Sequence, residues 1–387
     1  MRTVIGERLA LLAPATAAML QAAAVVGRTF AVAIAAEIAD VTTGAFEEAI
    51  GEAIAADVVV LVEPGRHRFS HALVAETLAN ALPPPIRAKL HRRAAETLTR
   101  LHAEDPFAPF AEIAHHWLSG GVEAAPEALA ATERAARAAE ARVAFADAAE
   151  LYERALAVLA SHAPGDARRR ADYLIRRGAN LVRDGDRERA KSVCTMACEV
   201  ARSLGDGELF AEAALAYGAD VAIAQADPTL IHMLEQAISL LPPGDNPWRA
   251  QVMARLAAAR QPSGDTREHV ALAHEAIAMA RRLGDGDLLY DVLFRAIGAL
   301  TDFERPEVRA PHNAEVARMA AAKGDRAQHL RSLQRLAFDM IDLCDVLGFE
   351  RTVTEYEVVG AATEQPRYRW APQMFRSMRA HWEGRLD

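Results

Sequence analysis

The dipeptide Gly-Asp recurs along this chain at intervals of 39 or 40 residues. It stands at Gly165-Asp166, Gly205-Asp206, Gly244-Asp245, Gly284-Asp285 and Gly324-Asp325. A glycine can end one helix in the left-handed conformation, and the aspartate after it can cap the next helix by accepting hydrogen bonds from first-turn amides. A fixed period of this length is typical of a solenoid of stacked helical pairs. Such repeats predict a protein that works by recognition more than by catalysis.

A second break falls about midway through each period and divides each unit into two helices. These breaks are at Gly185-Asp186, Ala226-Asp227-Pro228, Gly264-Asp265, Arg305-Pro306 and Leu347-Gly348. Proline suits the first turn of a helix, because its missing N–H would have no intrahelical partner there. We therefore expect one helix to start at Pro228 and another at Pro306.

Small and apolar residues in these units follow the spacing at which tetratricopeptide repeats let paired helices approach closely. In the unit after Gly165 they are Gly178, Leu181, Gly185, Ala190, Cys194 and Ala197, and an earlier unit has Ala136, Ala139, Ala148, Tyr152 and Ala155. The later units resemble the pattern more loosely. The predicted fold class is all-α, with a tetratricopeptide-like α-solenoid of period about 40 over residues 125–387.

The first 82 residues follow a different pattern. Three short helices are expected at about 8–26, 30–40 and 43–56, and strands at 58–62 and 66–70 flank the turn Glu63-Pro64-Gly65. Three helices followed by a hairpin predict a small winged-helix domain at 1–82. A helical connector at 83–124 then leads into the solenoid.

Composition supports a helical protein that binds other proteins. Of the 387 residues 51% are hydrophobic but only 6% aromatic, a mixture that favours closely packed helices. A net charge of −9 argues against nucleic acid or an anionic membrane as a partner of the whole molecule. No uncharged apolar run is long enough to span a membrane, and Glu7 and Arg8 interrupt any signal-peptide pattern.

The three cysteines, Cys194, Cys198 and Cys344, cannot form a fully paired disulfide framework, and all three fall in expected helices. We therefore expect a reducing, cytoplasmic location. Cys194 and Cys198 have no second pair nearby with which to hold a metal ion, so we expect buried small side chains and no metal site.

A winged helix can bind DNA, but the charges of its recognition helix argue against that function here. This helix, expected at 43–56, contains Glu47, Glu48 and Glu52, and no lysine or arginine occurs between Arg28 and Arg66. Affinity for DNA depends on neutralising phosphates. We therefore expect this helix face to be solvated, and a DNA-binding transcription factor is the weakest of the hypotheses.

Four segments, at 11–30, 68–78, 90–95 and 114–117, stand in an order that resembles one known family. It is the winged-helix and tetratricopeptide half of bacterial STAND signal-transduction ATPases, including large LuxR-type transcriptional regulators. In that family an ATPase module precedes the winged helix, and the repeats sense an inducer or a partner protein. The resemblance implies a regulatory region that belongs with signal transduction and transcription regulation.

The chain departs from that family in lacking the phosphate-binding loop. It has no Gly-x-x-x-x-Gly-Lys-Ser/Thr sequence, and its lysines never follow a glycine. We expect no cofactor in this chain, and ATP or ADP only where an ATPase module is joined or docked. The resemblance places His71 where STAND proteins often carry a histidine that touches the β-phosphate of ADP. The alternative is that His71 caps the helix that begins there.

No pattern of catalytic residues emerges, so we predict that the chain is not an enzyme. His115 and His116 are adjacent and point about 100° apart on a helix, so they cannot chelate one ion together. No Gly-x-Ser-x-Gly elbow or His-Glu-x-x-His helix occurs. The expected site is instead a partner-binding face on the first helix of each pair. Its candidates are Arg176, Asn180, Arg183, Tyr217, Asp220, Arg255, Arg260, Tyr290, Arg295, Arg331 and Arg335.

The last expected helix starts near Pro366 and runs through Trp370 and Trp382. Its apolar edge suggests that it docks on something or that more chain follows. The preferred hypothesis is a sensor region whose winged helix docks on an ATPase module and whose solenoid binds a protein or a small inducer. A stand-alone tetratricopeptide adaptor is the main alternative.

Overall fold

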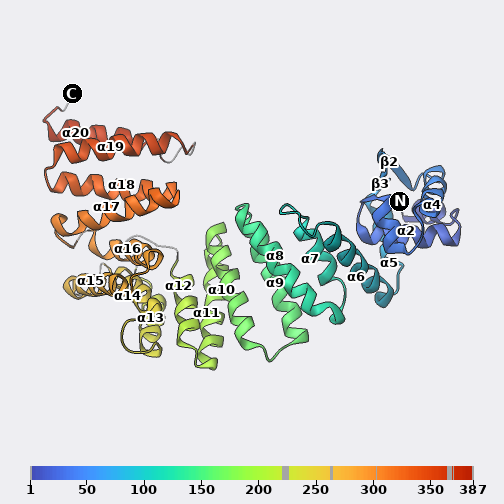
Figure 1. Cartoon of the computed structure of the whole chain (residues 1–387), viewed down its shortest axis with the longest axis horizontal. Helices are drawn as coiled ribbons and strands as arrows, with labels where there is room; N and C mark the ends of the chain where they lie inside the picture. The colour runs from blue at the N-terminus through green and yellow to red at the C-terminus, as the bar shows by residue number, and fades with distance from the viewer. Residues whose placement is uncertain are drawn as a thin grey trace. The chain divides into compact units, whose positions relative to one another are not determined.

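The computed structural model describes residues 2–219, 226–261, 265–301, 303–363, 368 and 370–385. The chain divides into two compact units, Met1–Val193 and Cys194–Asp387. Both are built from helices that follow one another in pairs, with one small sheet near the N-terminus (Figure 1). The predicted all-α solenoid is confirmed.

The first unit begins with a compact domain of helices and a small sheet. Its elements are α1 (Arg2–Leu9), α2 (Pro14–Val26), β1 (Thr29–Ala31), α3 (Val32–Ala39), α4 (Thr43–Ala55), β2 (Val59–Glu63), β3 (Arg66–Phe69) and α5 (Ala72–Asn80). The strands form an antiparallel sheet in the order β1-β3-β2. The predicted order of three helices and a hairpin is therefore present.

Two details of this domain differ from the prediction. The helix expected at 8–26 is two helices, because Pro14 occupies the first turn of α2 and a turn separates α2 from α1. The helix expected at 30–40 starts only at Val32, since the residues before it form β1, in which Thr29 lies opposite Arg68 of β3. A strand of three residues is too short to show an alternating pattern in the sequence.

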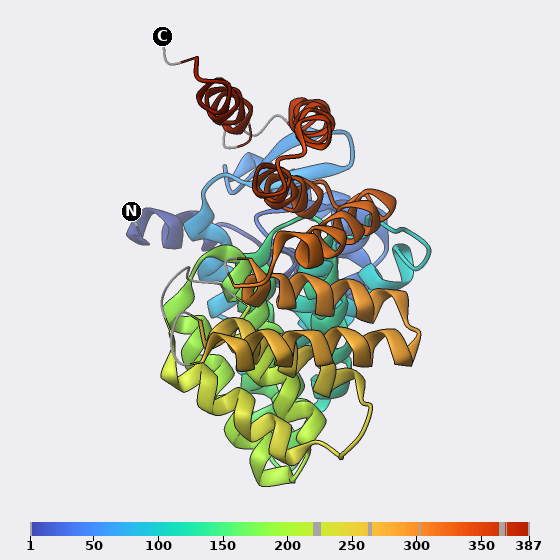
Figure 2. The same ribbon diagram turned by 90° about the vertical axis from the view of Figure 1, so that its left-hand side faces the viewer.

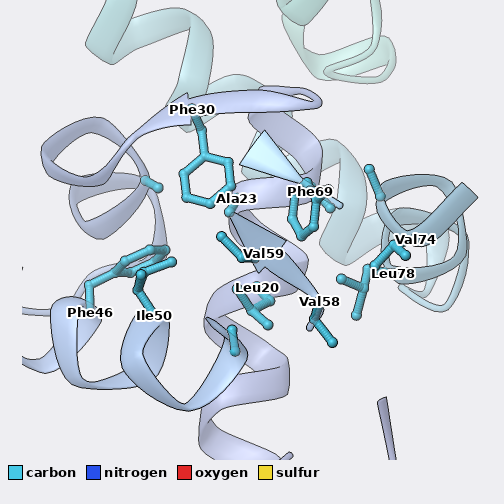
Figure 3. Close-up of a cluster of buried hydrophobic side chains, with 14 of the residues drawn as sticks. Leu20, Ala23, Phe30, Phe46, Ile50, Val58, Val59, Phe69, Val74 and Leu78 are labelled. Atoms are coloured by element: carbon cyan, nitrogen blue, oxygen red, sulfur yellow. The ribbon is translucent and has the colours of Figure 1, made fainter. Parts of the chain in front are cut away.

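Aromatic side chains hold the sheet of this domain to its helices (Figure 3). Phe30 of β1 and Phe69 of β3 are buried with their ring centroids 5.3 Å apart. Phe46 of α4 meets Phe30 edge to face at 6.4 Å. Leu20 of α2 and Ile50 of α4 belong to the same buried cluster. One core thus joins elements from both ends of the domain.

The rest of the first unit is a series of helices stacked in chain order. They are α6 (Pro84–Leu101), α7 (Phe110–Leu118), the 3₁₀ helix η1 (Val122–Ala124), α8 (Ala125–Ala141), α9 (Phe145–His162), α10 (Ala167–Asp184) and α11 (Arg187–Leu204), whose last turns belong to the second unit. Ion pairs link α6 to α3 and to the residue that follows it: Arg100 pairs with Glu37 of α3 at 2.5 Å, and Arg93 pairs with Asp40, the C-cap of α3, at 2.9 Å. The N-terminal domain is thereby tied to the helices that follow it.

The second unit continues the helical pairs. Its helices are α12 (Gly207–Tyr217), α13 (Pro228–Leu240), α14 (Pro247–Ala259), α15 (Thr266–Leu283), α16 (Gly286–Leu300), α17 (Pro306–Lys323), α18 (Arg326–Asp342), α19 (Val346–Ala361) and α20 (Ala371–Trp382). Helices α17, α18 and α19 stack in chain order in two views (Figures 1 and 2). Pro228 and Pro306 each occupy a first turn, as predicted.

The breaks between helices use the expected residues with few exceptions. Gly284 ends α15 in the left-handed conformation at φ 74°, and the Asp285 side chain accepts hydrogen bonds from two first-turn amides of α16. Before α14, however, Asn246 rather than Asp245 is the cap. Gly165 has no positive φ. Gly264 lies outside the described residues.

The final break and the C-terminal helix also differ from the prediction. Asp345 caps α19, so Gly348 lies within the first turn of that helix and not between helices. Cys344 precedes the cap with φ 54°, outside any helix. Helix α20 starts at Ala371, and Pro366 lies outside the described residues. Trp382 packs edge-on against Phe349 at 6.2 Å, so this end of the helix is not a free apolar edge.

Candidate functional site

The candidates on α10 in the first unit are largely engaged within the protein. Asn180 is buried and donates hydrogen bonds to Glu140 Oε1 at 2.7 Å and to the Arg176 carbonyl at 2.9 Å. Arg176 is exposed and donates from Nε to the Asp172 carboxylate at 3.0 Å. The Arg183 guanidinium lies 5.4 Å from the centre of the Phe145 ring. Asn180 therefore links α10 to α8 and does not face a partner.

The first candidates in the second unit also have internal partners. Tyr217 is mostly buried, and its hydroxyl donates to Asp227 Oδ2 at 3.3 Å. Arg255 is 6% exposed and donates from Nε to the Gly218 carbonyl at 2.7 Å. Arg260 pairs with Glu235 at 2.8 Å. Asp220 lies outside the described residues. These side chains hold α12, α13 and α14 together.

Tyr290 on α16 belongs to a charged cluster at the start of that helix. Its hydroxyl donates to Asp325 Oδ2 at 3.1 Å, and the Lys323 ammonium lies 5.4 Å from the centre of its ring. Lys323 also pairs with Asp287. Burial raises the pKa of Tyr290, so its phenol stays protonated near neutral pH. The sequence placed Tyr290 on a binding face, whereas the structure ties it to the turn between α17 and α18.

Three further candidate arginines of the second unit lie without a carboxylate in ion-pair contact. Among the described residues, Arg295, Arg331 and Arg335 make no ion pair. Arg331 is exposed, while Arg295 Nε and Arg335 Nη1 are buried without a hydrogen-bond acceptor. Burial lowers the pKa of both Arg295 and Arg335, because it disfavours the charged guanidinium. Of the predicted face, Arg331 is thus exposed to solvent, whereas Arg295 and Arg335 each keep one buried donor without an acceptor.

A buried charged network close to this face was not predicted from the sequence. Arg309 of α17 donates from Nε to Asp339 Oδ1 of α18 at 2.6 Å, and Asn313 donates to Asp339 Oδ2 at 2.6 Å. Arg309 also reaches the Glu304 carbonyl at 2.8 Å and the Asp342 carboxylate. Asp339 is 2% exposed. The network fastens α17 to α18, and a spacing of thirty residues gave no signal for it.

A cluster of three imidazoles lies between α6 and α7. His91 Nδ1 and His116 Nδ1 share a hydrogen bond of 2.9 Å, and the His115 ring lies 5.7 Å from that of His91. Burial lowers the pKa of His91 to about 4 and that of His116 to about 3. Both are therefore neutral near pH 7. The described residues contain no group of three or more histidine, cysteine, aspartate or glutamate side chains placed to hold a metal ion.

His71 of the N-terminal domain is the cap of α5. Its Nδ1 accepts a hydrogen bond from the Leu73 amide at 3.2 Å, and its side chain is exposed. The capping alternative is thus observed, and the nucleotide-sensing role stays a prediction. On α4, Glu47 and Glu48 are exposed, whereas Glu52 accepts from the Ala13 amide at 2.6 Å and so caps the neighbouring helix.

A comparison with solved structures found chains of similar fold. A STAND protein with a tetratricopeptide repeat sensor, from Pyrococcus horikoshii, is similar to this chain with a TM-score of 0.49 and 12% sequence identity. The match covers 97% of this chain and 61% of that one, so this chain spans less than two thirds of that protein's length. No family model matches the sequence. No curated protein matches it. Within the described ranges, no helix is long and apolar enough to cross a membrane.

Proposed function

We propose that this chain is a non-catalytic regulatory region of a STAND-type signalling or transcriptional regulator, and that its helical pairs bind a protein or a small inducer. The observation that supports this most is the series of capped helical pairs whose first helices carry Arg295, Arg331 and Arg335 without internal carboxylate partners. A charged group that has no partner inside a fold is more useful for binding than for stability. Free thiols at Cys194 and Cys198 fit a reducing cytoplasm.

In this proposal the N-terminal domain is a winged helix that docks on an ATPase module. It couples the nucleotide state of that module to the helical repeats. The ion pairs from Arg93 and Arg100 on α6 to α3 provide a rigid connection between the domain and the helices that follow. His71 can keep its cap on α5 through Nδ1 while Nε2 is left for a phosphate of bound ADP. In a protein that contains the ATPase module, His71→Ala should weaken retention of ADP and raise basal activity. Unchanged retention and activity would rule out this role.

Two other functions predict different behaviour. A stand-alone adaptor would bind its partner equally well with and without nucleotide. A DNA-binding protein would need α4 to approach phosphates, although Glu47 and Glu48 are exposed on it. DNA binding would have to rely on Arg66 and Arg68, which are exposed on β3, the central strand of the sheet.

Hydrogen exchange on the native protein tests the proposal. The protein is isolated with its partner from source cells under gentle conditions, and exchange is measured before and after the partner is removed. We expect partner-dependent protection in the first helices of the repeats, above all in α16 and α18. Protection confined to α4 and β3 that depends on added duplex DNA would contradict the proposal, and protection unaffected by ATP or ADP would favour the adaptor.

A further inference from the structure

Three consecutive first helices carry an arginine at the same position of the repeat. Arg255 of α14, Arg295 of α16 and Arg335 of α18 follow one another at intervals of forty residues, one repeat each. Between α14 and α16 the packing keeps this register, because a Cβ placed on Gly298 of α16 would lie 3.2 Å from the Cβ of Ala258, its counterpart on α14. Helix α18 is linked to α16 through α17, which packs against both, so the three arginines occupy equivalent positions of successive repeats.

Arg255, the first of these three arginines, finds a hydrogen-bond acceptor inside the protein, whereas Arg295 and Arg335 each keep a donor without one. Arg255 donates to the Gly218 carbonyl at 2.7 Å, directly after α12 ends. Arg295 Nε and Arg335 Nη1 are buried and have no acceptor among the described residues. A donor that leaves water without finding a partner costs free energy, and more so when it is charged. An acceptor supplied by a ligand would remove this penalty.

The surrounding charges leave both guanidiniums available to an anion. The carboxylate that acts on Arg295 is Asp291, one turn earlier on the same helix, and it forms no ion pair with it. Asp339, one turn after Arg335, is already occupied by Arg309. Arg331 adds a further positive charge one turn before Arg335.

We propose that Arg295 and Arg335 are two separate anchors for the carboxylates of one acidic peptide segment, which lies extended across α16 and α18. This inference rests on the proposed function and names the class of partner. The two arginines lie on different helices that do not pack directly on each other, so they act as distinct points. Guanidinium groups pair with carboxylates through two parallel hydrogen bonds.

The geometry of the helices sets the spacing of the carboxylates in the ligand. Helix α17 packs against both α16 and α18, and packed helices lie about 8–10 Å apart. The axes of α16 and α18, linked through α17, can therefore lie up to about 20 Å apart. An extended peptide advances about 3.3 Å per residue, so acidic residues about three to six positions apart would reach both anchors. Phe338, three residues after Arg335 on α18, packs edge to face against Phe375 of α20 at 6.1 Å. It is 37% exposed, and its exposed part offers an apolar contact that a free inorganic anion would not use.

Fluorescence anisotropy on the full chain tests this proposal. The probes are dye-labelled peptides with two glutamates, in a series where the gap between them grows one residue at a time, and the same peptides with glutamine. We expect the glutamate series to bind, with an optimum gap, and the glutamine series to bind at least about ten-fold more weakly. Arg295→Gln and Arg335→Gln should each weaken binding by about ten-fold or more.

A matched control removes the same charge elsewhere. Arg318 on α17 is exposed, and Arg318→Gln should leave peptide binding unchanged. If it weakens binding as much as Arg295→Gln does, attraction to general positive charge would explain the result and the proposal would fail. Equal binding of peptides with one and two glutamates would refute the two anchors. Full competition by inorganic phosphate at concentrations near the peptide's own Kd would show a small-anion site instead.

A stability measurement separates a binding role from a structural one. If Arg295 has no internal partner, then Arg295→Met should leave the melting temperature unchanged or raise it while it abolishes peptide binding. A large fall in melting temperature would mean that Arg295 supports the fold, which would overturn its role as a free anchor. Absence of acidic-peptide binding together with partner protection elsewhere on the repeats would remove this inference and leave the proposed function standing.

Discussion

Replacing Asp339 by asparagine should destabilise the second unit, because it leaves the buried Arg309 guanidinium without its main counter-ion. Asp339 is 2% exposed and accepts hydrogen bonds from Arg309 and Asn313, both at 2.6 Å. Removing one partner of a buried ion pair costs about 3–5 kcal/mol. We expect about 3 kcal/mol here, since Arg309 keeps the Glu304 carbonyl and the Asp342 carboxylate as acceptors.

The loss in the free energy of unfolding corresponds to a fall in melting temperature that depends on the size of the unit. For a unit that spans Cys194–Asp387, about 3 kcal/mol corresponds to a Tm lower by about 6–12 °C. Circular dichroism and calorimetry would measure the shift, and hydrogen exchange would show whether α17 and α18 open first.

A double variant tests the reasoning behind this prediction. Burial raises the pKa of Asp339 even though Arg309 and Asn313 donate to it, so the network does not fully offset the cost of burying the carboxylate. Replacing both charges, in Arg309→Met with Asp339→Leu, should therefore recover most of the lost stability. If the double variant is as unstable as Asp339→Asn, the orphaned charge is not the cause and the reasoning is refuted.

Three further predictions concern the pH dependence and the helix ends. Burial holds the pKa of His116 at about 3, below its unfolded value of about 6.5, so the stability present above pH 6.5 should fall as the pH drops, by up to about 1.4 kcal/mol per pH unit. Urea unfolding at several pH values would show this slope, and His116→Gln should reduce it, leaving the contribution of His91, whose pKa is lowered to about 4. Asn246→Ala should cost about 1 kcal/mol as the loss of a helix cap, and Asp245→Ala less; equal losses would contradict the observed cap. Gly284→Ala, at φ 74°, should destabilise by about 1 kcal/mol, whereas Gly286→Ala, where an added Cβ meets nothing within 4 Å, should be neutral or stabilising in the same melts.

The repeat could be predicted from the sequence because the residues that end and cap its helices act locally. Asp285 and Gly284 act within a few residues of the helix ends that they define, so their spacing alone fixes the period. Where two capping residues were adjacent, at Asp245 and Asn246, the sequence did not show which side chain would accept the amide hydrogen bonds. β1 escaped notice because its pairing with β3 joins segments almost forty residues apart.

The candidate site was only partly predictable because burial depends on the neighbouring repeat. By their helix positions Asn180 and Arg255 were expected at the surface. Both are buried, because Asn180 donates a hydrogen bond to Glu140 and Arg255 donates one to the Gly218 carbonyl. Arg295 and Arg335 occupy equivalent positions without such acceptors. The sequence indicates which residues share a position in the repeat, and the structure decides which of them remain unpaired.

The most direct test of the proposed regulatory function is the intact mass and nucleotide content of the native protein, isolated from its source cells with an antibody against the repeats. The proposal predicts a polypeptide much heavier than 41.8 kDa that carries bound ATP or ADP. A nucleotide-free species of 41.8 kDa would contradict it and would identify the chain as an independent adaptor.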